Sequence, residues 1–345
     1  MFQLSSDITI GNFHFSGVHE VKIKRSIHSY VDTATIKLPA KAQVSKNGKI
    51  LSQSVITGKQ FTDGDPVTIK LGYSGLLIEE FKGFVTSRDL DIPLQVTCEG
   101  YSYKLKRNNL SVIAENITIA DLLQYATARQ DITVICDVDI TLVNVELSSL
   151  TGAGIIDSIL KETDGNLCIF FIAPTVLWCG LVYTPYAKGN DVFNMGQSRY
   201  RLGYNVLKDN SLKQRVPQDD PGIWIYTKKK TNGTLLTGQS TDMSGASKRN
   251  TQTLNRIADE KTLAALAQEH QYRDNYTGYE GSINAFLQPY CSPGFQAWIS
   301  DDKYPERNGF YLVEGTEVTF GTSGARRKID AGPLLMNTAT PTTSQ

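Results

Sequence analysis

Two stretches that lie far apart in this chain share a pattern of short alternating strands punctuated by glycine. The first covers residues 64–100 and the second covers residues 294–332. Each begins with a Gly-x-x-[Val/Ala]-x-Ile string and continues into a strand that contains Gly-Phe. Such alternation with glycine turns is typical of small barrels or sandwiches. A chain built from a repeated β-module is expected to be a scaffold that forms a ring, because an enzyme needs only one cleft.

The overall composition argues against an electrostatic attraction to nucleic acid or to an anionic membrane. The chain has 345 residues, enough for two or three domains, and its formal net charge is +0. The longest apolar run, residues 167–183, is interrupted by Pro174 and Gly180, which favours a buried hairpin over a membrane span. The N-terminal residues show no secretory signal. We therefore predict no nucleic-acid recognition and no membrane insertion.

The five cysteines are scattered, and their number is odd. Cys98, Cys136 and Cys168 each lie within an apolar, strand-like run. Small apolar environments of this kind are typical of buried free thiols. The sequence therefore predicts folding in a reducing compartment.

The pattern along the chain predicts a mainly β protein with an α+β insert, in which two similar β-barrel domains flank a small middle domain. We expect the first barrel over residues 1–110 and the α+β domain over residues 111–190. The second barrel, with a preceding helix, is expected over residues 191–335. The Thr-rich segment 336–345 is predicted to be a disordered tail.

Three helices and one long loop are predicted between the strands. Apolar residues at helical spacing predict a helix after Thr118, which is a suitable N-cap, and a second helix over about residues 154–163. The most pronounced helical pattern covers residues 253–273. Residues 228–250 are polar, with Gly and Ser spread through them, and predict a mobile loop.

No catalytic or metal-binding signature is present in the sequence. The four histidines, at positions 14, 19, 28 and 270, are not clustered, and no two cysteines have Cys-x-x-Cys spacing. His14 lies between Phe13 and Phe15 and is best explained as a residue on one face of a strand. The chain also lacks a P-loop, a nucleophile elbow and a dinucleotide-binding fingerprint. We therefore predict no enzyme activity, no catalytic residue, no metal and no cofactor.

Two residue sets leave a carbohydrate-binding or glycan-degrading β-protein as the alternative function. Three acidic residues could form a carboxylate pair across two strands, although solvent-facing positions of a hairpin explain them better: Asp137, Asp139 and Glu146. Three tryptophans could serve as sugar platforms, although their apolar strands favour core packing: Trp178, Trp224 and Trp298. An intracellular hydrolase that uses the same acids is a further rival.

Two basic clusters, residues 228–230 and 326–328, are the remaining charged features. Since the overall charge is balanced, solvated faces are the favoured explanation. Contacts with an acidic partner surface are the alternative. The motifs identify no residue of a partner interface.

The order of these pieces resembles the baseplate hub proteins of contractile phage tails. The string over residues 64–105 is similar to the first barrel of that family, with its G-D-x-V-x-I-x-x-G-Y strand and a closing strand that ends near C-E-x-x-x-Y. The string over residues 293–332, preceded by a helix, is similar to the second barrel. The resemblance spans roughly residues 7–335 and extends to phage tail gene D products and to the N-terminal part of type VI secretion spike proteins.

The resemblance implies a structural protein that is not an enzyme. Family members form a homotrimer whose paired tube-type barrels make a pseudo-six-fold ring between the tail tube and the central spike. It thus implies four partners: further copies of the chain, a tube protein, a trimeric spike and other baseplate proteins. It places the protein in a virion tail baseplate or an injection apparatus, assembled in the bacterial cytoplasm. Only a short tail follows Gly332, so we expect the spike to be a separate protein.

Overall fold

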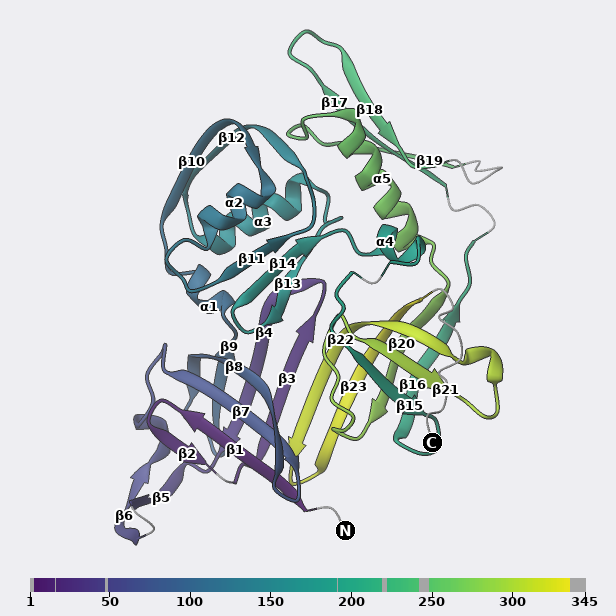
Figure 1. Cartoon of the computed structure of the whole chain (residues 1–345). Coiled ribbons are helices and arrows are strands. Elements are labelled where there is room, and N and C mark those ends of the chain that lie inside the picture. Colours follow the sequence, from purple (N-terminus) through teal and green to yellow (C-terminus); the bar gives the residue numbers. More distant parts are fainter. Residues whose placement is uncertain are drawn as a thin grey trace.

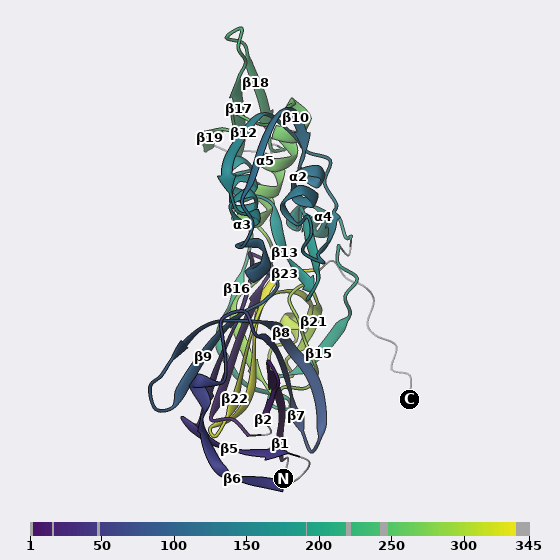
Figure 2. The same ribbon diagram turned by 90° about the vertical axis from the view of Figure 1, so that its left-hand side faces the viewer.

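The protein has two tiers, a lower tier of β-strands and an upper tier that contains its longer helices (Figure 1). The computed structural model describes residues 3–15, 17–46, 49–190, 192–218, 222–241 and 248–335. Figure 2 shows the same two tiers from the side, with the upper tier above both halves of the lower one. The predicted mainly β class is confirmed, and strands of both ends of the chain meet in one large sheet.

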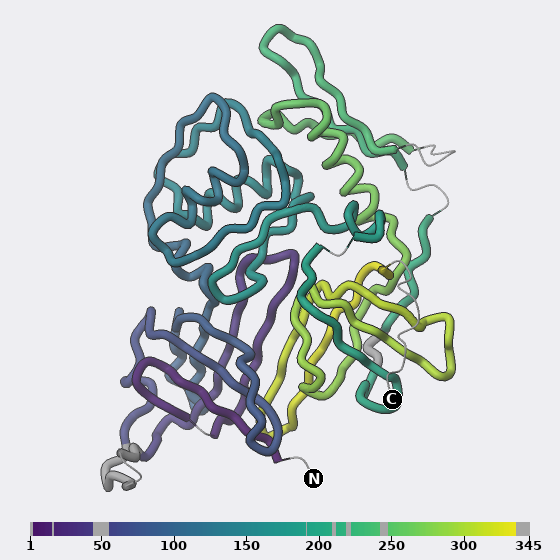
Figure 3. Tube along the Cα trace, viewed as in Figure 1, coloured from purple at the N-terminus to yellow at the C-terminus, as the bar shows by residue number. Residues whose placement is uncertain are grey.

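The lower tier consists of two β-modules that lie side by side (Figure 3). The strands of the first module are β1 (Leu4–Ile10), β2 (Phe13–Phe15), β3 (Glu20–Ser26), β4 (Ser29–Leu38), β7 (Pro66–Tyr73), β8 (Leu76–Asp89) and β9 (Leu94–Glu99). Those of the second are β15 (Gln197–Arg201), β16 (Val206–Arg215), β20 (Gly278–Ala285), β21 (Gln296–Ser300), β22 (Gly309–Gly321) and β23 (Gly324–Leu334). A small hairpin, β5 (Lys41–Lys46) and β6 (Lys49–Ile56), and a 3-10 turn, Thr57–Lys59, extend the first module.

Both modules follow the same strand path. The first has the spatial order β3-β4-β9-β8-β7-β1, and the second has the order β16-β20-β23-β22-β21-β15. If the six strands of each module are numbered by their order in the chain, with β2 left out, both modules have the spatial order 2-3-6-5-4-1. The prediction of two similar modules agrees with this arrangement. The predicted closed barrels are not found: among the described residues, β1 does not pair with β3, and only the isolated bridge between Leu202 and Val206 lies between β15 and β16.

Alternating burial explains why these segments form strands with one inner face. In β7, Val67, Ile69 and Leu71 are buried, whereas Thr68 and Lys70 between them are partly exposed. Gly72 ends this alternation where β7 and β8 approach closely, since a Cβ atom there would lie 1.8 Å from the carbonyl oxygen of Leu76. Apolar residues of both modules, including Val318 and Phe320 of β22, complete the core of the first module.

The upper tier combines three small sheets with helices. One sheet pairs β10 (Leu110–Thr118) with β12 (Thr141–Leu150), and another joins β11 (Thr133–Cys136), β14 (Val176–Gly180) and β13 (Cys168–Ala173). The third joins β18 (Leu235–Gln239), β17 (Ile223–Lys229) and β19 (Arg249–Thr253). The helices are α1 (Ser102–Leu105), α2 (Ile119–Ala126), α3 (Gly152–Glu162), α4 (Tyr183–Ala187) and α5 (Glu260–Asp274), with a 3-10 turn at Pro305–Arg307. Among the described residues, none of these helices has the length and apolar character needed to cross a membrane.

The predicted helices are present, with one later start. The Thr118 side chain accepts a hydrogen bond from the Asp121 N–H, so it caps α2 as predicted. Helix α5 begins at Glu260 rather than near residue 253, because Asp259 has an extended backbone and accepts the N–H of Thr262. The residues ahead of it take other roles: Arg249–Thr253 form a strand, and Leu254 and Ile257 enter the core.

The predicted mobile loop at residues 228–250 is wrong for most of its length. Strand β18 pairs with β17 in antiparallel register, and β19 pairs with β17 in parallel register. The polar composition misled the prediction because one cation is buried: the Lys228 ammonium donates to the Ile257 carbonyl at 2.6 Å. Residues 242–247, and the predicted tail 336–345, lie outside the described residues.

One hydrophobic core joins the two halves of the upper tier. Ile119, Leu123 and Ile156 lie in the same core as Leu263 and Leu266 of α5. Tyr226 of β17 is buried there as well. The domain boundaries at residues 110, 190 and 335 remain predictions, but this core connects segments on both sides of residue 190. The second module thus carries an insertion, between β16 and β20, that packs against the middle segment (Figure 3).

Candidate assembly surface

The two modules join through a strand pairing that uses the second half of one edge of β22. Residues 309–312 of β22 pair with β21, whereas Gly315–Gly321 pair with β3 on the same side of the strand. Strand β23 pairs along the opposite side. Across this junction, the Glu317 carboxylate lies 2.7 Å from the Lys22 ammonium and 3.5 Å from that of Lys24. The fifth strand of the second module, β22, therefore pairs with the second strand of the first module, β3.

A buried ion pair also ties the modules together. The Arg327 guanidinium of β23 donates to the Glu80 carboxylate of β8 at 2.6 Å, and the two side chains are 1% and 4% exposed. Arg327 also donates to the carbonyl oxygens of Leu287 and Cys291. Burial by itself disfavours the charged guanidinium, but the Glu80 carboxylate outweighs it and raises the pKa of Arg327. The pair is satisfied only when both modules are in place.

Arg25 of β3 connects both modules to the upper tier. Its guanidinium donates to Asp32 at 3.1 Å within the first module, to the Ser292 hydroxyl at 2.8 Å in the second, and to the Phe171 carbonyl of β13 at 3.1 Å. A cavity of about 230 Å³ lies beside these groups, lined in part by Lys82. The charged residues here hold the three parts of the molecule together at one point.

Two strands of the long sheet, β16 at its end and β8 within it, have a stretch of edge without a described strand neighbour. Strand β16 pairs with β20 along one side, and on its other side the described residues contribute only the isolated bridge between Leu202 and Val206. At the first module, β8 pairs with β7 up to Phe84 and with β9 from Phe84 to Asp89. Gly64 and Asp65 bond the backbone of Val85 on the β7 side, but no described strand continues along residues 86–89. These two edges are the equivalents of the two sides of the β22–β3 junction.

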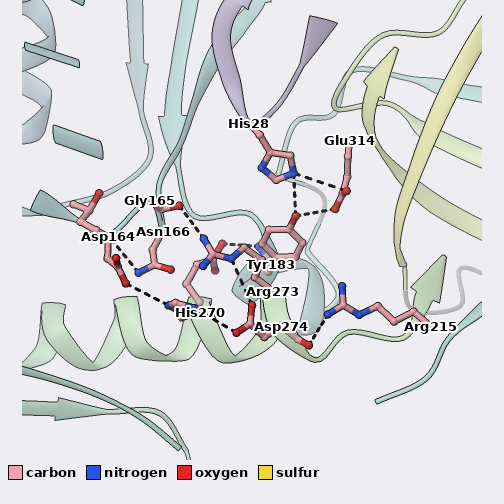
Figure 4. A network of polar contacts seen from close by, with 12 residues as sticks. His28, Asp164, Gly165, Asn166, Tyr183, Arg215, His270, Arg273, Asp274 and Glu314 are labelled. Atoms are coloured by element: carbon pink, nitrogen blue, oxygen red, sulfur yellow. Dashed lines mark hydrogen bonds and ion pairs between the residues drawn. The ribbon is translucent and has the colours of Figure 1, made fainter. Parts of the chain in front are cut away.

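The two tiers meet in a polar network that Figure 4 shows from close by. The Tyr183 hydroxyl of α4 donates to Glu314 of β22 at 2.7 Å and lies 3.3 Å from a ring nitrogen of His28. Burial, with Glu314 as the next cause, raises the pKa of Tyr183 well above its ordinary value. An activated nucleophile or general base needs the opposite shift, so this His-Tyr-Glu group is suited to holding the tiers together.

A second part of the network lies along α5. His270 lies 3.6 Å from Asp164 and 3.3 Å from Asp274, and its ring stacks on Trp224 with 3.5 Å between centroids. The Tyr226 hydroxyl lies 2.7 Å from the Nδ1 atom of His270, the same ring nitrogen that faces Asp164. The fully buried Glu269 carboxylate accepts the N–H groups of three successive residues at the start of α4: Val182, Tyr183 and Thr184. Each group is engaged by its neighbours in the fold.

The acidic residues predicted as a possible carboxylate pair do not form one hairpin. Strand β11 pairs with β14, and β12 pairs with β10, so Asp137, directly after β11, and Glu146 of β12 belong to different sheets' surroundings and not to one hairpin. Asp137 accepts the Trp178 indole N–H at 2.7 Å. The prediction of a shared hairpin fails because β14, which comes later in the chain, pairs beside β11.

The three tryptophans pack against other side chains, as the favoured interpretation predicts. Trp178 is buried beside Phe193, Trp224 stacks on His270, and Trp298 packs edge-on against Phe310. His14 is an exposed residue of β2, 3.1 Å from the Thr9 hydroxyl, as expected for a residue on a strand face.

The basic clusters divide between the interior and the surface. Lys228 and Arg327 are buried and bonded, in contrast to the solvated faces that the balanced charge predicts for both clusters. Lys328 forms an ion pair with Asp330 at 3.0 Å. Over the part of the chain that the structure describes, no three His, Cys, Asp or Glu side chains gather in a way that could hold a metal ion.

The fold is that of phage tail proteins. No protein-family model matches the sequence, and no curated protein matches it. The 43 kDa tail protein of prophage MuSo2 from Shewanella oneidensis superposes with a TM-score of 0.61 at 11% identity, over 95% of this chain and 98% of that one. The tail protein from Neisseria meningitidis MC58 gives 0.62 at 11% identity, over 95% and 96%.

A third similar structure is the c3393 protein of E. coli. It is described as a component of the type VI secretion system, with structural similarity to the T4 bacteriophage tail proteins gp27 and gp5. The TM-score is 0.57 at 10% identity, over 95% of this chain and 77% of that one. The resemblance drawn from the sequence is thereby confirmed at the level of the fold.

Proposed function

We propose that this chain is the structural baseplate hub of a contractile phage tail or of a phage-like injection machine. One observation carries the proposal: two modules with one strand path share a continuous sheet, and each module has one strand, β8 or β16, with an edge that no described strand covers. The similarity in fold to two tail proteins and to a secretion-system component supports it. In this role the protein is a scaffold and not an enzyme.

The junction inside one chain suggests how chains join. Where β22 of the second module receives β3 of the first, β8 of the first module would receive β16 from the second module of another copy. Repeating this step links modules alternately within and between chains. Three copies then present six similar modules in a closed ring, and closed cyclic symmetry limits the growth of the assembly. The same pairing covers the open strand edges.

Such a ring can join structures of different symmetry. Its six modules match a six-fold tail tube on one face, while its true three-fold symmetry matches a trimeric spike on the other. The spike and the tube are then separate proteins, and the site of action is a tail baseplate or injection apparatus. An obligate interface of this kind buries about 2,000 Å² or more. The upper tier, which holds its own core, lies outside the paired edges.

Light scattering on the purified protein, alone and mixed with its cognate spike, tests this assembly. We expect a mass three times that of the chain, formed more completely with the spike, because a partner that binds only the assembled state stabilises it. Lys213→Pro and Gln214→Pro, both in β16, form a matched pair of variants. Successive N–H groups of a strand point to opposite sides, so one variant loses a bond to β20 and the other loses only a donor on the open edge.

The variant that affects only the open edge should keep the unfolding midpoint of the wild type and remain a monomer. Thr237→Pro in β18, which is also an edge strand but lies in the upper tier, serves as the control and should still assemble. A stable monomer or a two-fold dimer of the wild type in both conditions would refute the hub proposal. Trimers of both β16 variants would refute the pairing of β8 with β16.

A further inference from the structure

Cys136 and Cys179 occupy directly paired positions on two neighbouring parallel strands. Cys136 is the last residue of β11, and its register partner on β14 is Cys179. Partner residues in a parallel pair project from the same face of the sheet, about 4.8 Å apart at Cα. A disulfide requires Cα atoms about 4.4–6.8 Å apart. Both residues are free thiols in this structure.

The two thiols differ in reactivity. A hydrogen bond from the Cys179 thiol is the main reason why the pKa of Cys136 is lowered to about 7. The same bond, with burial, raises the pKa of Cys179. A thiolate is the nucleophilic form of cysteine, so Cys136 is the one poised to react. Cys179 is fully buried behind it, in the core of the upper tier.

Access to the pair is through the edge of a sheet. Strand β11 is an outer strand of the β11-β14-β13 sheet, and Cys136 is partly exposed. The remaining three thiols, Cys98, Cys168 and Cys291, are buried, and burial raises the pKa of each. Cys136 is thus a partly exposed thiol with a lowered pKa beside Cys179, whereas the other three thiols are buried and have raised pKa values.

We propose that Cys136 and Cys179 form a redox site that a hydroperoxide converts into an intrachain disulfide. The Cys136 thiolate attacks one oxygen of hydrogen peroxide; the S–O bond forms, the O–O bond breaks, and the hydroxide released takes up a proton to become water. The Cys179 sulfur then attacks the Cys136 sulfenic acid, the S–S bond forms, and the hydroxyl leaves as a second water with the Cys179 proton. Two thiols are oxidised and one peroxide is reduced.

The disulfide would link the short strand β11 covalently to the buried strand β14. It closes a loop that includes β12, α3 and β13, so it constrains the unfolded chain and stabilises the upper tier. The site is independent of the proposed assembly, since it lies in the upper tier away from the two open edges. The reaction suits a protein that folds under reducing conditions and later meets an oxidising one.

Peroxide treatment of the full-length protein, followed by alkylation and peptide mapping, tests the site. We expect the loss of two of the five thiols, a dithiothreitol-sensitive link between the peptides that contain Cys136 and Cys179, and a rise in the unfolding midpoint of about 3–5 °C. In Cys179→Ala, Cys136 should stop at a sulfenic acid that dimedone traps. In Cys136→Ser, the Cys179 peptide should stay unmodified, whereas the control Cys291→Ala should keep the link.

Three results would overturn the proposal. They are a wild-type protein that keeps five free thiols, a wild-type Cys136 that proceeds to sulfinic acid without a link, and a link that joins Cys136 to Cys168. Because the wild-type protein provides all three readouts, the test does not depend on the folding of any variant.

Discussion

The two β-modules share a strand path but differ in the direction of their first strand. In the first module β1 runs antiparallel to β7, whereas in the second β15 runs parallel to β21. The first module places an extra strand, β2, between β1 and β3, while a short turn leads directly from β15 to β16. Side chains alternate between the two faces of a strand in either direction, so the inner face is preserved. The strand order is common to both modules, and the direction of an outer strand is not.

The modules also differ in where they carry insertions. The first holds the small β5–β6 hairpin between its third and fourth strands, and the second holds β17–β19 and α5 between its second and third. Each insertion leaves the sheet intact, because connections tolerate changes that strands within a sheet do not. The part that both modules share is therefore the six-strand sheet itself, and not the segments that connect its strands.

The largest expected effect comes from removing the buried charge that joins the modules. In Arg327→Met, Glu80 is left buried without its partner, and we expect a loss of about 3–5 kcal/mol in the free energy of unfolding. Denaturant unfolding measures it. The double variant Arg327→Met, Glu80→Leu should recover part of the loss, and Lys328→Ala, on the surface of the same strand, is the control. A loss below 1 kcal/mol would mean that the modules do not depend on this pair.

Equivalent core positions show whether the modules unfold together. Ile69 of β7 and Ile299 of β21 occupy the fourth strand of each module, and both are fully buried. Ile69→Val and Ile299→Val should each cost about 0.5–1.5 kcal/mol. Because one sheet connects the modules, we expect each variant to shift the same single transition, measured by tryptophan fluorescence and circular dichroism. Two separate transitions, each shifted by only one variant, would show that the modules are independent.

The surface charges at the junction should contribute less than the buried pair. Lys22→Ala removes the shorter of the two contacts to Glu317, and exposed ion pairs of this kind contribute about 0.2–1 kcal/mol. The loss should shrink when the unfolding is repeated at 1 M salt, because salt screens exposed charges. Lys70→Ala, on the outward side of β7, provides a matched control. A loss that salt leaves unchanged would point to packing of the lysine stem.

The smallest expected effect is the contribution of Glu20 of β3 to the free energy of unfolding, which should be lost at low pH. Its hydrogen bond with Lys37 of β4 holds the pKa of Glu20 below the ordinary value of 4.5. A carboxyl with a lowered pKa in the folded state stabilises the protein above its unfolded pKa, and this contribution is lost as the pH falls through the folded pKa. Glu20→Gln should therefore cost a few tenths of a kcal/mol at pH 7 and nothing near pH 2. An equal cost at both pH values would exclude the charge as its cause.

Local patterns in the sequence were sufficient to predict many of the elements, although not β18 and β19. Alternation in residues 64–100 and 294–332 predicted strands, and apolar spacing after Thr118 predicted a helix with its cap. These patterns involve residues within a few positions of each other, so the side chains alone carry the information. The repeat of one module could also be predicted, because each copy repeats its own glycines and alternation.

Long-range pairing could be decided only by the tertiary structure. Nothing near Lys228 or Arg327 indicates burial, since the partner of Arg327 lies 247 residues away, at Glu80. The prediction of an acidic hairpin failed for the same reason. Strand β11 pairs with β14 and not with β12, the strand that follows it in the chain. A strand can pair with any exposed edge of suitable register, and the rest of the fold determines which edge is available. The sequence by itself thus determined the modules and their inner faces, while the tertiary structure decided the junction between them and which strand edges have no described neighbour.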